Sequence, residues 1–97
     1  MTGKLLRMLG LARRAGSLTY GITAVKAELK KANAKLVIFE SDLAEGSKEE
    51  LLKELSTVKA IQIPHTKEEI GYAIGTKPTG ILSISDEHFK NGILSNI

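Results

Sequence analysis

Residues 13–42 read RRAGSLTYGITAVKAELKKANAKLVIFESD and decide the fold. They join a basic pair, a turn marked by glycines, an amphipathic segment rich in lysine and a continuous apolar run. Leu36 to Phe39 are four strand-forming apolar residues in a row, which is typical of a strand covered on both faces. We therefore predict that residues 36–39 form the central strand of a small sheet with helices on both sides.

The segment before this strand has the spacing of an amphipathic helix over residues 22–32. Its apolar face is expected to bury Ile22, Val25, Leu29 and Ala32. Its opposite face turns toward solvent with Thr23, Lys26 and Lys30. Because the helix begins just after Gly21, its first backbone N–H groups lack helical acceptors and the positive end of its dipole points out of the turn. The sequence thus predicts an anion site there.

Local patterns place the elements before and after this region. A helix is expected over residues 4–14, stopped by Gly16, and a brief strand over residues 17–20. Ser47 and Glu50 have the spacing of a capping box, which predicts the start of a third helix carrying three leucines at Leu51, Leu52 and Leu55.

The second half continues to alternate strands and helices. A strand near a sheet edge is expected over residues 59–63, where Pro64 stops it. Thr66 and Glu69 form another capping box for a helix that ends at Gly75, and Gly71 inside it predicts close packing of backbone. A last strand is expected over residues 80–85. Asp86 then caps a final helix containing Phe89 and Ile93.

Length, composition and charge narrow the class of protein. The 97 residues fit a single domain, 1–97, and the lack of cysteine excludes disulfides and thiolate metal sites, so a cytoplasmic protein is expected. No apolar run is long enough to suggest a membrane span. Residues 1–35 carry eight basic residues and one acid, whereas residues 36–97 carry six basic and ten acidic residues. This asymmetry is typical of a surface that meets phosphates, but solvated helix faces explain the charge equally well.

Catalytic and cofactor patterns are not found in the sequence. His65 and His88 lie in different elements without metal-ligand spacing, so each is expected to be a surface or capping histidine. Lys77 follows Gly75 and Thr76, but the segment comes after a helix and precedes Pro78, unlike a phosphate loop. We therefore expect no enzyme, no metal and no cofactor.

The aromatic content does not favour stacking of single-stranded bases. The aromatic residues are few, namely Tyr20, Phe39, Tyr72 and Phe89. Phe39 belongs to the predicted central strand, and partial burial is expected for Tyr20 and Tyr72. Any nucleic acid partner is thus expected to be structured and contacted by helix ends and backbone.

Two segments resemble a known family: AKLVIFESD at residues 34–42 and EIGYAIG at residues 69–75. Together with the order of the elements over nearly the whole chain, they resemble the kink-turn-binding ribosomal proteins of the seven-Ae and thirty-e superfamily, most of all its small bacterial YlxQ-like members. The resemblance implies a three-layer α-β-α sandwich with a four-stranded mixed sheet. It also implies binding to kink-turns, which are sharply bent RNA motifs built on sheared G·A pairs, within ribosomes or other ribonucleoprotein particles.

The chain departs from this family where the family reads bases. The glycine that opens the second helix is matched by Gly21, but the family's Asn, Glu and Lys positions hold Thr23, Ala24 and Ala27. Side chains that contact phosphate rather than bases fix position without reading sequence. The residues assigned to RNA binding are Arg13, Arg14, Gly21, Thr23, Lys26, Lys31, Lys77 and Pro78.

Two hypotheses follow. The chain is a module that binds structured, kink-turn-like or ribosomal RNA, with possible ribosomal or ribonucleoprotein partners. The alternative is a protein-interaction module on the same fold that has lost specific kink-turn recognition. The residues that favour the alternative are Ala24, Ala27 and the acids of the third helix, Glu45, Glu49, Glu50 and Glu54.

Overall fold

The computed structural model describes residues 2–55 and 57–97. Within them helices and strands alternate along the chain. Their bounds are α1 Thr2–Arg14, β1 Leu18–Tyr20, α2 Ile22–Lys30, β2 Leu36–Phe39, α3 Glu45–Leu52, β3 Lys59–Gln62, α4 Lys67–Ile74, β4 Ile81–Ile84 and α5 Glu87–Leu94. No helix in this part of the chain is both long and apolar enough to cross a membrane.

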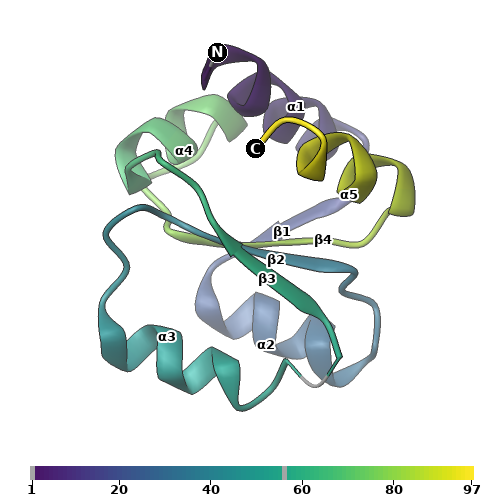
Figure 1. Ribbon diagram of the computed structural model, residues 1–97, viewed down its shortest axis with the longest axis vertical. Helices are drawn as coiled ribbons and strands as arrows, with labels where there is room; N and C mark the ends of the chain where they lie inside the picture. The colour runs from purple at the N-terminus through teal and green to yellow at the C-terminus, as the bar shows by residue number, and fades with distance from the viewer. Residues whose placement is uncertain (1, 56) are drawn as a thin grey trace.

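The strands form one mixed sheet in the order β1-β4-β2-β3. β2 pairs parallel with β3 and antiparallel with β4, while β1 pairs antiparallel with β4. Helices α1, α4 and α5 cover one face of this sheet, and α2 and α3 cover the other (Figure 1). The predicted three-layer sandwich is therefore confirmed.

The alternation of side chains along β2 explains why both faces are covered. Leu36 and Ile38 belong to the core beneath α1, α4 and α5, whereas Val37 and Phe39 belong to the core beside α2 and α3. All four are 3% exposed or less, so the continuous apolar run does form a strand buried on both faces. β3 is an edge strand, as Pro64 just beyond it predicts.

Two predicted helix ends are wrong. α3 begins at Glu45 after Ala44, with no side-chain cap, so Ser47 lies inside the helix and cannot cap it. α2 ends at Lys30, and Ala32 is exposed rather than buried. The N–H of Ala32 donates to Leu29 and that of Asn33 to Glu28, which closes the helix in a Schellman motif. Ala32 accordingly has a φ of 60°, a conformation that usually requires glycine.

The local patterns of α4 are confirmed. Thr66 and Glu69 form the capping box, and Gly75 ends the helix with a φ of 79°. A Cβ on Gly71 would meet the backbone carbonyl of Lys77 and lie 2.9 Å from the Cα of Pro78. The loop over residues 76–79 therefore packs directly on α4, which fixes its path into β4.

Candidate nucleic-acid interface

The N-terminus of α2 is held at one end of the sheet and is open to solvent. The N–H of Gly21 donates to the carbonyl of Ile81 at 2.9 Å, so the start of the helix is tied to the start of β4. Gly21 has a φ of 90° and provides no side-chain cap, and the first turn holds no acid. The first N–H groups of α2 and the positive end of its dipole are therefore uncompensated by any side chain of that turn.

Arg13 joins three elements beside this helix start. Its Nη1 donates to the carbonyl of Ile74 at 2.6 Å, at the end of α4. Its guanidinium lies over the ring of Tyr20 with 5.0 Å to the centroid, and Tyr20 directly precedes Gly21. Arg13 thus fixes the ends of α1 and α4 next to the start of α2.

Lys77 and Pro78 lie at the same end of the sheet. Both are exposed, and the loop that carries them runs into β4 at Ile81, the partner of Gly21. We call the set formed by Arg13, Tyr20, Gly21, Gly75 and the 76–79 loop the sheet-end interface. It brings one guanidinium, one ammonium and an open helix N-terminus together, which suits contact with phosphates.

Lys26 lies one turn further along α2 and has an acidic partner. Its Nζ donates to Oε2 of Glu50 on α3 at 2.8 Å. The hydrogen bond and the negative charge of Glu50 raise the pKa of Lys26 above its ordinary value. The pair lies in a groove of about 350 Å³ that is also lined by Ile22, Thr23, Ala27 and Lys30. The sequence did not predict this pairing, because 24 positions separate the two residues.

Two of the residues assigned to RNA lie apart from the others. Lys31 caps the C-terminus of α2, about 15 Å along the helix axis from Gly21. Arg14 is exposed at the end of α1, and because successive residues of a helix point about 100° apart, its side chain diverges from that of Arg13, which covers the Tyr20 ring. The structure therefore brings Arg13, Gly21, Lys77 and Pro78 to one end of the sheet, and it places Lys31 near the other end.

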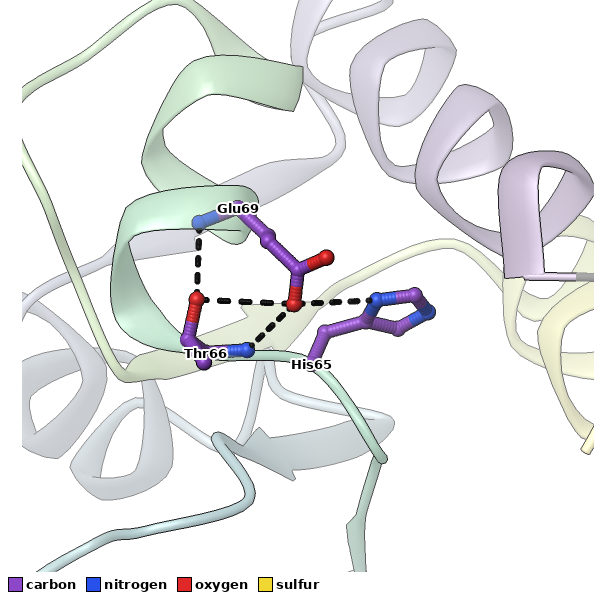
Figure 2. Close-up of polar contacts among 3 residues, drawn as sticks. All are labelled: His65, Thr66 and Glu69. Carbon is purple, nitrogen blue, oxygen red and sulfur yellow. Dashed lines mark hydrogen bonds and ion pairs between the residues drawn. The ribbon is translucent and has the colours of Figure 1, made fainter.

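His65 is buried rather than at the surface, which corrects one prediction. It is 2% exposed, and neither ring nitrogen has a hydrogen-bond partner among the described residues. Its Nδ1 lies 3.5 Å from Oε1 of Glu69, which accepts a hydrogen bond from the N–H of Thr66 (Figure 2). The hydrogen bond from the N–H of Thr66, with His65 nearby, lowers the pKa of Glu69. Within residues 2–55 and 57–97, no three His, Cys, Asp or Glu side chains are grouped to hold a metal ion.

Tyr72 corrects a second prediction. Tyr72, on α4, is 90% exposed, although partial burial of the ring with the hydroxyl in water was expected. Tyr20 is 37% exposed and is partly covered by Arg13, in line with the expectation for that residue. The chain therefore presents the ring of Tyr72 almost fully to solvent.

Comparison with known proteins agrees with this architecture. RNA-binding protein YlxQ of Bacillus subtilis is 28% identical over 92 residues, which cover 91% of this chain and 89% of YlxQ. A Bacillus halodurans protein of unknown function has a structure that matches with a TM-score of 0.86 at 26% identity, covering 95% of this chain and 94% of that one. A 15.5kD RNA binding protein of Giardia lamblia shares the fold, with a TM-score of 0.74 at 21% identity over 97% of this chain and 82% of that one.

The family assignment rests on nearly the whole chain. Residues 3–93 match the family described as "Ribosomal protein L7Ae/L30e/S12e/Gadd45 family". This range includes both segments on which the resemblance rests, residues 34–42 and 69–75. The order of helices and strands and the mixed four-stranded sheet agree with that match. The chain belongs to the ribosomal protein L7Ae/L30e/S12e/Gadd45 family.

Proposed function

We propose that this chain binds structured RNA at the sheet-end interface. The observation that carries the proposal is the convergence of the open α2 N-terminus at Gly21, the guanidinium of Arg13 and the exposed loop of Lys77. The name of the similar YlxQ protein, which describes RNA binding, supports it. We expect the protein to work in the cytoplasm, as part of a ribosomal or other ribonucleoprotein particle.

Most of the binding free energy is expected to come from contacts to the phosphates and sugars of the RNA rather than to its bases. Ala24 and Ala27 offer no polar group, and of the three family reading positions only Thr23 can form a side-chain hydrogen bond. A good bidentate base contact contributes about 1–3 kcal/mol of discrimination, which these alanines do not provide. The ligand is therefore a kink-turn-like RNA that is recognised mainly by its bent shape. Discrimination between bases is expected to be weaker than in family members that carry Asn, Glu and Lys at the three reading positions.

A titration tests the proposal. Binding is measured at several salt concentrations to a kink-turn hairpin, to the same hairpin with its G·A pairs replaced, and to a plain duplex. The kink-turn hairpin is expected to bind best. Lys77→Ala should weaken its binding and reduce the salt slope by about 0.7–0.9, the value of one phosphate contact. Equal weak affinity for all three RNAs would contradict shape selection, and no binding at moderate salt would contradict RNA binding.

Lys53→Ala is the matched control. Lys53 is also exposed, but it follows α3 and precedes β3, whose first residue pairs with Leu36 at the far end of the sheet. Its removal lowers the net charge equally and should leave the salt slope unchanged.

The acidic surface of α3 favours protein interaction as a second candidate. Glu45, Glu49 and Glu50 are exposed there, together with Leu52. If the titration shows no RNA binding, a partner with a basic surface becomes the expected ligand of this face.

A further inference from the structure

A groove between α1 and α4 lies outside the sheet-end interface. It has a volume of about 400 Å³, and its α1 wall is formed by Gly3, Leu6 and Arg7. Its α4 wall is formed by Glu69, Tyr72 and Ala73. Tyr72 does not contribute to the hydrophobic core, because it is 90% exposed. An aromatic ring on a helix surface beside a basic residue is suited to stacking a base.

The two helices that form the groove are held rigidly against each other. A Cβ on Gly10 would lie 2.8 Å from the carbonyl oxygen of Ala73, so the helices touch through backbone at that point. Further along, Arg13 donates to Ile74. Tyr72 is therefore presented on a fixed scaffold, and ordering it on binding involves only its own two side-chain torsions.

The exposed face of α1 is positively charged, and one of its cations, Arg7, lines the groove. Lys4, Arg7 and Arg14 are exposed, and their spacing places them on one face of the helix. α1 contains no acid, and no carboxylate of the described residues lies within ion-pair distance of these three cations. Phosphates therefore complement this face, which extends about 15 Å from Lys4 to Arg14.

The α4 wall differs in charge. Glu68 and Glu69 are exposed there, and Oε1 of Glu69 accepts from the N–H of Thr66. A bound strand is thus oriented, because its phosphates are attracted toward α1 and repelled from α4 while its bases face Tyr72. The basic face of α1 ends at Arg14, whose neighbour in the chain, Arg13, belongs to the sheet-end interface, so one strand can follow α1 from that interface toward the groove.

We propose that this groove binds an unpaired nucleotide of an RNA strand that leaves the structured site, with its base stacked on Tyr72 and its flanking phosphates on Arg7 and Lys4. The inference rests on the proposed function, since the structured part of the RNA positions the strand. It adds a second recognition element to the sheet-end interface.

The experiment compares kink-turn hairpins that differ only in a single-stranded extension. One hairpin is blunt, and two carry a uridine overhang of about six nucleotides at the 5′ or the 3′ end. For the wild-type chain, one overhang should raise affinity about fivefold or more, as expected for stacking of one base. Tyr72→Leu and Arg7→Gln should remove this gain and leave affinity for the blunt hairpin nearly unchanged. Tyr72→Phe should retain the gain, as should the charge control Lys53→Gln.

The outcomes separate the two proposals. Blunt-hairpin binding without any gain from either overhang overturns the groove and leaves the proposed function standing. A gain that persists in Tyr72→Leu also overturns it. A Tyr72-dependent dimer in sedimentation, without an overhang effect, assigns the groove to a second copy of the chain instead. Failure of all hairpins to bind overturns the proposed function and the groove together.

Discussion

Lys26 and Glu50 are joined across helices α2 and α3, with 2.8 Å between Nζ and Oε2, so the basic face of α2 is partly neutralised by the acidic helix beside it. Glu50→Gln removes the neutralising charge and should raise affinity for structured RNA about two- to fivefold, the range of a surface ion pair. The gain should shrink at high salt. Binding of a kink-turn hairpin in a salt series measures both effects.

Glu49→Gln is the control for this prediction. It removes the same charge from the adjacent residue of α3, which has no ion-pair partner among the described residues. An equal gain for both variants would mean that net charge, and not release of Lys26, is responsible.

Gly71→Ala tests how firmly α4 positions the 76–79 loop. The added methyl group would collide with the backbone of Lys77, and backbone gives way less easily than a side chain. We expect a loss of about 1–3 kcal/mol in the free energy of unfolding, together with weaker RNA binding as the loop shifts. Gly46→Ala in α3 meets nothing within 4 Å, so it should be neutral or stabilising by up to about 1 kcal/mol. Denaturant unfolding compares the two variants.

Ala32→Gly is expected to stabilise the protein. Ala32 closes the Schellman motif of α2 at a φ of 60°, which costs about 1–2 kcal/mol for a residue with a Cβ. Glycine relieves this cost but enlarges the freedom of the unfolded chain, so a net gain of about 0.5 kcal/mol remains. Gly75→Ala creates the same strain at a φ of 79° and should have the opposite sign. A lower thermal midpoint for Ala32→Gly would contradict the left-handed conformation of this residue.

Glu69 should make the stability of the protein depend on pH in the acid range. The N–H of Thr66, with His65 nearby, lowers the pKa of Glu69 from its ordinary value of 4.5. A carboxylate whose pKa is lowered by folding stabilises the fold fully at any pH above its ordinary, unfolded pKa. This stabilisation is lost as the pH falls through the lower pKa of the folded state. Glu69→Gln keeps an acceptor for Thr66 but does not titrate.

Thermal unfolding across the acid range measures this effect. The stability of wild type relative to Glu69→Gln should be constant above about pH 5 and should fall below it. Parallel curves down to the acid limit would exclude a contribution from Glu69.

Local patterns were predictable from the sequence because neighbouring residues determine them. The two-faced strand β2 follows from its own four residues, and α4 follows from Thr66, Glu69 and Gly75. The start of α3 was misjudged because the Ser47 and Glu50 pattern lies inside a helix that begins at Glu45 without a side-chain cap. The spacing of a capping box marks a helix start only where no helix has begun a few residues earlier in the chain.

The remaining features depend on contacts between distant residues. Lys26 has the appearance of a free cation until α3 brings Glu50 beside it. His65 follows an edge strand, yet its ring is buried, and Tyr72 lies in an amphipathic helix, yet α1 leaves it uncovered. The sequence therefore indicated a basic surface, but not which cations are already paired or which aromatic ring is exposed.

The position of β4 decides how the basic segments of the chain come together. This strand lies between β1 and β2, and its Ile81 carbonyl holds the N–H of Gly21. Residues 1–80 contain the basic segments but lack the strand that joins them, so these segments are brought together only through contacts distant in sequence. The basic segments by themselves therefore carry the positive charge but not the geometry of the proposed RNA site, which depends on β4.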